Sequence, residues 1–276
     1  MTSAKDWQLQ ISEAELSAMT RDLDEAHQES IPTMFAQARD FSAELADTGA
    51  APVGIRERRF GRRGFLLGLG GVGAGLALAA CSSSSTVNTS STGGPSAMGS
   101  PSMGSSASPY TGDLKVVALA TALENQAVAA YSAALSAATA GKLGTVPPAV
   151  ATFVQTAMGQ HSDHAKAWNA VLSSAKVPTI TGVPLSTQPQ VLSALGAVTT
   201  VGGVANLALE LENQAAQTYL FAAGNVTSAG GIATAASIAP VEAMHAAILQ
   251  FVLGEYPVPD TFLGTSKAAS PTILTV

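Results

Sequence analysis

The chain has few charged side chains, few aromatic side chains and only one cysteine among its 276 residues. Charged residues make up 12% of the sequence and aromatic residues 5%, whereas 47% is hydrophobic. This apolar share excludes a disordered, solvating chain as a whole, because such chains bury too little apolar surface to fold. The net charge of −6 argues against a nucleic-acid partner. With a single cysteine, an intramolecular disulfide is impossible.

The few charges are divided unevenly along the chain. Residues 1–50 hold ten acids and three bases, and residues 51–81 hold one acid and five arginines. Residues 82–276 hold eight acids, five lysines and no arginine. A charge inside an apolar helix of so uncharged a segment needs a partner, because burial of a lone charge is costly. Composition predicts four regions: an acidic helical extension over 1–55, an export signal over 56–81, a linker over 82–110 and a helical domain over 111–276.

The stretch GRRGFLLGLGGVGAGLALAAC (61–81) has the layout of an export signal, with a basic start, an apolar run and small residues before a cut. Arg62 and Arg63, followed by Phe-Leu, resemble the twin-arginine translocation motif, and LAAC ending at Cys81 resembles a lipobox. The resemblance implies export by the twin-arginine machinery and a lipid anchor on Cys81 at the outer face of the cytoplasmic membrane. A transmembrane helix is the alternative, but an apolar run of about 16 residues is shorter than the usual 20 or so.

The segments on either side of this signal differ in character. Residues 11–26 place apolar side chains at helical spacing, and Ser12 with Glu15 forms the pattern of a capping box. We expect a helix or helical hairpin that is lost with the signal, and we interpret His27 as a surface histidine. The alternative is a start at Met34, which would leave a signal of more ordinary length. Residues 82–108, rich in Ser, Gly and Pro, predict a flexible tether.

A phrase in the first helix of the last region returns 88 residues later: LENQAVAAY (123–131) becomes LENQAAQTY (211–219). Positions i and i+7 lie on nearly the same face of an α-helix. Glu124 and Tyr131 therefore share one stripe, and Glu212 and Tyr219 share the equivalent stripe of a second helix. Two glutamates in apolar helices predict a common partner.

A second pair of phrases follows each copy of the first. His161-Ser-Asp-His164 and Glu242-Ala-Met-His245 both have the i, i+3 spacing that points two side chains to one side of a helix. Glycines 141, 144 and 224 are placed where the first helix of each unit should end. The fold class predicted is all-α: a four-helix bundle of two αα-hairpins, joined by a long crossover (179–199) with a short helix.

Each first helix then contributes one carboxylate to the bundle core, and each second helix contributes two groups one turn apart. Together they predict a site for two hard or borderline cations, iron or manganese. The six candidate ligands are Glu124, His161, His164, Glu212, Glu242 and His245.

This pattern resembles the ferritin-like di-metal carboxylate proteins, such as rubrerythrin, bacterioferritin and manganese catalase, and most of all exported bacterial proteins with a ferritin-like domain. The resemblance covers about residues 112–257. It implies two iron or manganese ions acting on oxygen or peroxide, in ferroxidase or catalase-like chemistry. It also implies that Tyr131 and Tyr219 hydrogen-bond the ligands or supply an electron. A homodimer is compatible with it.

His161 departs from the family pattern, which has glutamate at this position. Three carboxylates and three imidazoles leave the centre one negative charge short of the usual arrangement. If His161 is a ligand, metal affinity is expected to fall as the pH drops through about 6.5. The alternative function is a non-catalytic envelope or stress-related scaffold with a degenerate metal site.

Overall fold

The structure is a computed structural model that describes residues 7–47, 108–259 and 263–276. Over these ranges the regular elements are helices, and the only β-pairing is an isolated bridge between Leu185 and Leu274. The predicted export signal, with Arg62, Arg63 and Cys81, lies outside the described residues.

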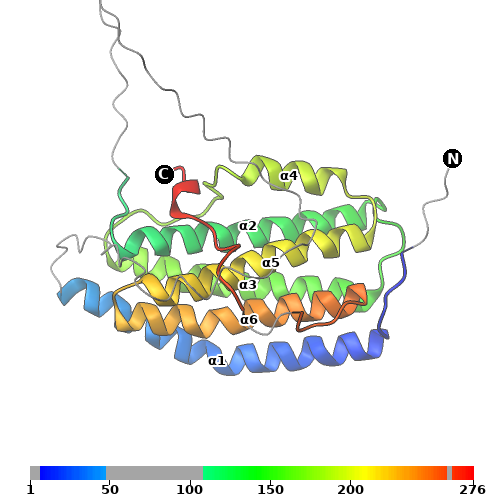
Figure 1. Ribbon diagram of the computed structural model, residues 1–276, viewed down its shortest axis with the longest axis horizontal. Helices are drawn as coiled ribbons and strands as arrows, with labels where there is room; N and C mark the ends of the chain where they lie inside the picture. The colour runs from blue at the N-terminus through cyan, green and yellow to red at the C-terminus, as the bar shows by residue number, and fades with distance from the viewer. Residues whose placement is uncertain (1–6, 48–107, 260–262) are drawn as a thin grey trace, which may run out of the picture. The chain divides into compact units, whose positions relative to one another are not determined.

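Four helices form the bundle that the repeat predicts. Helix α2 (Asp113–Thr139) pairs with α3 (Pro148–Ser174), and α5 (Val201–Asn225) pairs with α6 (Ala229–Leu253). The crossover between the two hairpins contains the short helix α4 (Gln188–Ala197), which lies beside α2 and α5 (Figure 1). The all-α fold of two hairpins with a crossover is therefore confirmed. The chain ends after a short 3₁₀ helix, η2 (Pro271–Ile273).

Local signals set most of the helix ends. Gly141 and Gly144 follow α2 with φ angles of 70° and 74°, which L side chains rarely adopt. The hydroxyl of Ser228 accepts a hydrogen bond from the backbone N–H of Gly231 and so caps the start of α6. The prediction that Gly224 ends its helix is wrong, because α5 continues through it to Asn225. Here the extended Val226 and the Ser228 cap, rather than the glycine, break the helix.

The apolar core is divided into two parts along the bundle. One cluster includes Leu119 of α2 and Trp168 of α3, and the other includes Tyr131 of α2 and Phe153 of α3. On both helices the candidate ligands lie in sequence between the residues of the two clusters. The site is thus in the middle of the bundle, with packed apolar side chains on both sides.

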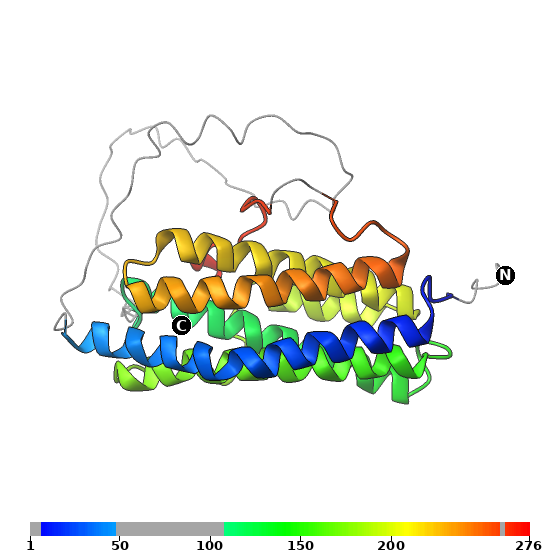
Figure 2. The same cartoon turned by 90° about the horizontal axis from the view of Figure 1, so that it is seen from below.

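A fifth long helix, α1 (Glu13–Asp47), packs against α3 and α6 and runs along both in Figure 2. It starts at the predicted capping box, in which the backbone N–H of Ser12 donates to Glu15 and that of Glu15 donates to the Ser12 hydroxyl. Near its other end, Phe41 comes so close to α6 that a Cβ on Gly230 would lie 2.4 Å from the Phe41 backbone nitrogen. Helix α1 is one continuous helix and not a hairpin.

The buried face of α1 follows a spacing of three and four residues, typical of a helix that packs along another helix. Its buried side chains are Leu16, Thr20, Leu23, His27, Met34, Ala38 and Phe41. The interpretation of His27 as a surface residue is therefore wrong: it is 1% exposed, one heptad before Met34 and two before Phe41. The missed signal was this seven-residue spacing, which places His27 on the apolar stripe.

Among the described helices, α6 alone is long and apolar enough to cross a membrane by length and composition. Such a helix can equally be the core helix of a folded domain. In α6, Glu242 and His245 are fully buried and face the other helices of the bundle. Its hydrophobicity therefore serves the core.

Candidate metal centre

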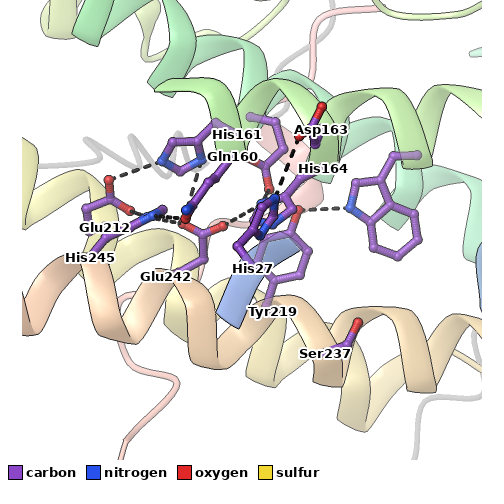
Figure 3. Close-up of polar contacts among 12 residues, drawn as sticks. His27, Gln160, His161, Asp163, His164, Glu212, Tyr219, Ser237, Glu242 and His245 are labelled. Carbon is purple, nitrogen blue, oxygen red and sulfur yellow. Dashed lines mark hydrogen bonds and ion pairs between the residues drawn. The ribbon is translucent and has the colours of Figure 1, made fainter. Parts of the chain in front are cut away.

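The structure brings together all six candidate ligands at mid-bundle, each 2% exposed or less. Figure 3 shows the three histidines with Glu212 and Glu242. Helices α2 and α5 contribute Glu124 and Glu212, α3 contributes His161 and His164, and α6 contributes Glu242 and His245. The i, i+7 and i, i+3 spacings account for this, because each helix presents one polar stripe to the same interior space.

The six side chains form two overlapping groups, each with its ligand atoms within 4.8 Å of one another. One group is Glu124, His161, His164 and Glu242, and the other is His161, Glu212, Glu242 and His245. Each group offers carboxylate and imidazole ligands suited to iron or manganese. The arrangement can therefore hold two adjacent cations, with His161 and Glu242 common to both.

Two members of the cluster lack the hydrogen bonds that buried polar atoms normally make. Nδ1 of His164 lies 2.9 Å from Oε1 of Glu242, yet neither carboxylate oxygen of Glu242 and neither nitrogen of His164 makes a hydrogen bond. Ligand atoms that face a common cation, and not each other, give this combination of short distance and missing hydrogen bond. The residues present fit a metal centre.

His161 lies inside the centre and not at its edge. Its Nδ1 is 2.6 Å from Oε2 of Glu124, and its Nε2 is 3.1 Å from Oε1 of Glu212. The imidazole thus spans the first glutamates of the two repeats, with one nitrogen toward each.

In the absence of cations the cluster is held by proton-mediated ion pairs. Burial by itself would raise the pKa of Glu124, but the facing His164 and His161 lower that pKa to about 2. Burial would lower the pKa of His164, but Glu124 and Glu242 raise it to about 9. The pKa of His161 is likewise held well above its usual value against the effect of burial, by Glu242, Glu212 and Glu124.

These shifts correct the expected pH dependence of metal binding. Because a histidine must lose its proton before it binds a cation, protons compete with metal up to the raised pKa values. The affinity of the site for metal should therefore keep rising with pH until His164 loses its proton near pH 9. It should not level off above pH 6.5.

Each tyrosine of the repeat donates a hydrogen bond to a glutamate of the other hairpin. Tyr131 of the first repeat donates its hydroxyl hydrogen to Glu212 of the second, and Tyr219 of the second donates to Glu124 of the first. Burial and the adjacent glutamates raise both tyrosine pKa values well above 10, so both hydroxyls stay protonated and act as donors.

The surroundings of the two tyrosines differ. The indole N–H of Trp168 donates to the Tyr219 oxygen over 2.9 Å, and the two rings are stacked. Leu249 occupies the position in α6 that corresponds to Trp168, four residues after the histidine. Tyr131 instead lines a cavity with side chains such as Phe153, Val201 and Leu249. The Tyr219 hydroxyl therefore has a second polar partner in Trp168, whereas Tyr131 borders an apolar cavity.

Helix α1 contacts His164 directly and reaches His245 through Gln160, and the sequence analysis did not foresee either contact. The His27 ring lies edge-on to His164 with the ring centres 5.2 Å apart. The amide nitrogen of Gln160 donates to Asp24 of α1 over 3.4 Å, while its oxygen lies 2.9 Å from Nε2 of His245. Burial, followed by the adjacent His164, lowers the pKa of His27 to about 4, so this imidazole is neutral at neutral pH.

Comparison with known proteins gives one result for this part of the chain. A family model described as a ferritin-like domain matches residues 112–255, just over half of the 276 residues. The match includes all six candidate ligands and both tyrosines, and it excludes α1. Neither the curated proteins nor the solved structures gave a match.

The metal-free protein is expected to lose thermal stability as the pH rises from 6.5 through about 9. The raised pKa of His164 means that the folded state binds its proton more tightly, a contribution present below 6.5 and lost as that pKa is passed. The depressed pKa of Glu124 gives the opposite limit, with stability lost below about 4.5 toward pH 2. The melting temperature, followed by circular dichroism in the presence of a chelator, measures both changes.

Protein saturated with Mn²⁺ is the control for the alkaline change, because the cation has already displaced the proton. Its melting temperature should vary much less between pH 6.5 and 9. An equal fall with and without Mn²⁺ contradicts the assignment of this titration to the cluster.

Proposed function

Because this chain belongs to the ferritin-like family, we propose that its buried cluster holds two iron or manganese ions and that the protein carries out oxidation chemistry with dioxygen or peroxide. The observation that carries the proposal is the cluster of six ionisable groups from four helices, buried in an apolar bundle and divided into two cation-sized groups. When bound, the ions supply the change of oxidation state.

The side chains of the protein divide the remaining tasks. Glu124 and His164 would hold one ion and Glu212 and His245 the other, with Glu242 and His161 between them. Tyr131 and Tyr219 fix the orientation of the two outer carboxylates by donating hydrogen bonds from the opposite repeat. The two apolar core clusters exclude water from the centre, which strengthens its electrostatic interactions.

The cavity beside Tyr131 favours dioxygen as the oxidant. Its walls are almost wholly apolar, and an apolar cavity offers no hydrogen-bond partners to water or to hydrogen peroxide. Dioxygen is small and apolar and needs none. A second space, lined by Glu124, His161 and Glu212, also contains Gln126, Gln214 and Thr218 and so offers polar partners, and the proposal therefore keeps both ferroxidase-like and catalase-like chemistry.

One observation favours a second candidate function, a scaffold without catalysis. Both nitrogens of His161 are already within hydrogen-bond distance of carboxylates, so part of the cluster is satisfied without metal. A protein that is isolated metal-free and is stable in that form fits this role.

Metal content separates the two functions. Protein purified from its native source without added metal is expected to carry iron or manganese, and Glu212→Gln should remove at least half of it because the second group loses a charged ligand. Glu210→Gln is the matched control, since Glu210 is exposed on the same helix and outside both groups. Elemental analysis of the three proteins gives the answer. A metal-free parent, or equal metal in all three, supports the scaffold.

The His161→Glu variant is expected to bind metal more tightly while its metal-free form becomes less stable. A fourth carboxylate adds the missing negative charge for the cations, yet it leaves like charges facing one another in their absence. We expect about a tenfold or larger gain in Mn²⁺ affinity, roughly 1.4 kcal/mol. Calorimetric titration measures the affinity, and thermal unfolding in chelator measures the stability. Unchanged values for both quantities rule out a place for His161 in the centre.

We also propose that the domain is exported by the twin-arginine machinery and lipid-anchored to the outer face of the cytoplasmic membrane. The support is the order of motifs in residues 61–81: paired arginines, an apolar run and LAAC at the lone cysteine.

Cys81→Ala is accordingly expected to abolish labelling by a lipid precursor and to release the domain from the membrane fraction. Replacement of Arg62 and Arg63 by lysines tests the route separately and should block export. Continued lipid labelling of Cys81→Ala refutes the anchor, whereas unchanged export of the lysine variant refutes the route.

A further inference from the structure

His164 and His245, the second ligands of the α3 and α6 pairs, both direct one nitrogen inward. Nδ1 of His164 lies 2.9 Å from Glu242, and Nδ1 of His245 lies 3.3 Å from both Glu212 and Glu242. Each ring therefore has its Nε2 on the outer side. A metal-bound histidine commonly donates its outer N–H to a carboxylate, a carbonyl or a similar acceptor, which fixes the ring and raises its basicity.

The structure supplies such an acceptor for His245 from within the bundle. The side-chain oxygen of Gln160, on α3, lies 2.9 Å from Nε2 of His245. Gln160 in turn donates to Asp24 of α1. The outer side of His245 is thus connected to α1 through one amide.

The internal repeat shows why His164 lacks the same partner. Alignment of His164 with His245, 81 residues later, places Gln160 opposite Val241. A buried valine has no acceptor to offer, and Nε2 of His164 makes no hydrogen bond to any described residue. The two halves of the centre are therefore unequal at this one position.

Helix α1 places another imidazole beside the His164 ring. His27 is buried, its ring is edge-on to His164 with the centres 5.2 Å apart, and neither of its nitrogens makes a hydrogen bond (Figure 3). Its Nε2 lies 3.8 Å from Oδ2 of Asp163, so a neutral ring with its proton on that side keeps Nδ1 free as an acceptor. A buried acceptor and a buried donor, each without a partner, occupy neighbouring rings.

We propose that His27 is the outer hydrogen-bond partner of His164 and that α1, outside the matched domain, is a working part of the metal centre. The proposal rests on the metal-binding function proposed above. His27 is a positioning residue: it acts on the cation through the orientation and basicity of His164.

The proposal has a consequence for the predicted processing of the chain. Cleavage before Cys81 would separate α1 from the bundle in sequence. The processed protein would keep a complete centre only while α1 stays bound to α3 and α6 through its buried stripe.

The test compares His27→Leu, which removes both nitrogens at similar bulk, with His27→Gln, which keeps a side-chain oxygen as acceptor. Met34→Leu is the matched control, because Met34 is buried one heptad further along the same stripe. All variants are made in the full chain, and Mn²⁺ affinity is measured by titration alongside thermal unfolding in chelator.

For His27→Leu we expect Mn²⁺ affinity to fall about 10- to 100-fold, the usual cost of losing an outer partner. Its metal-free melting temperature should stay the same or rise, because two unsatisfied buried nitrogens are gone. His27→Gln should recover most of the affinity, and Met34→Leu should leave it unchanged. The added substitution Val241→Gln in the His27→Leu chain should also restore affinity, by placing an amide where the repeat has Gln160.

The outcomes separate the inference from the function on which it rests. A parent protein that binds no Mn²⁺ overturns both. If the parent binds Mn²⁺ but His27→Leu binds it equally tightly, the inference alone is overturned. If Met34→Leu loses as much Mn²⁺ affinity as His27→Leu, the loss comes from altered packing of α1. That result also overturns the inference.

Discussion

The attraction between three carboxylates and three imidazoles inside an apolar bundle is the interaction on which the rest of the structure depends. Each group would be costly to bury alone, and their mutual attraction offsets that cost whether protons or cations complete the balance. This attraction requires that the four helices hold their polar side chains at the same level along the bundle. The apolar clusters on both sides, which include Trp168 and Phe153, provide that register.

The internal repeat explains both the symmetry of the centre and its departures from symmetry. Glu124 and Glu212, with Tyr219 and Tyr131 donating to them across the hairpins, follow the duplicated phrase closely. His161 opposite Glu242, Trp168 opposite Leu249 and Gln160 opposite Val241 do not. The differences give the two halves unlike charge, unlike access and unlike outer contacts, so two cations bound there would not be equivalent. Such inequality suits a centre in which one ion exchanges more readily than the other.

Helix α1 changes the description of the domain. The matched family domain begins at residue 112, yet residues 13–47 cover α3 and α6. They contact His164 through His27 and reach His245 through Asp24 and Gln160. The family match therefore covers the helices that carry the six candidate ligands, whereas α1, which contacts them from outside, lies beyond the matched residues. Outer contacts of this kind orient the ligands and change their affinity for metal.

The sequence by itself determined the four bundle helices, the crossover and the six candidate ligands, because each rests on local periodicity and on a repeat that can be read along the chain. It also determined the tyrosine stripes and the departure at His161. Only the tertiary structure decided that α1 packs on the bundle and that His27 is buried beside His164, since these contacts join residues more than 100 positions apart. The raised histidine pKa values and the end of α5 beyond Gly224 were likewise decided there. A local pattern shows which face of a helix is apolar, but the neighbour that covers this face is set by long-range packing.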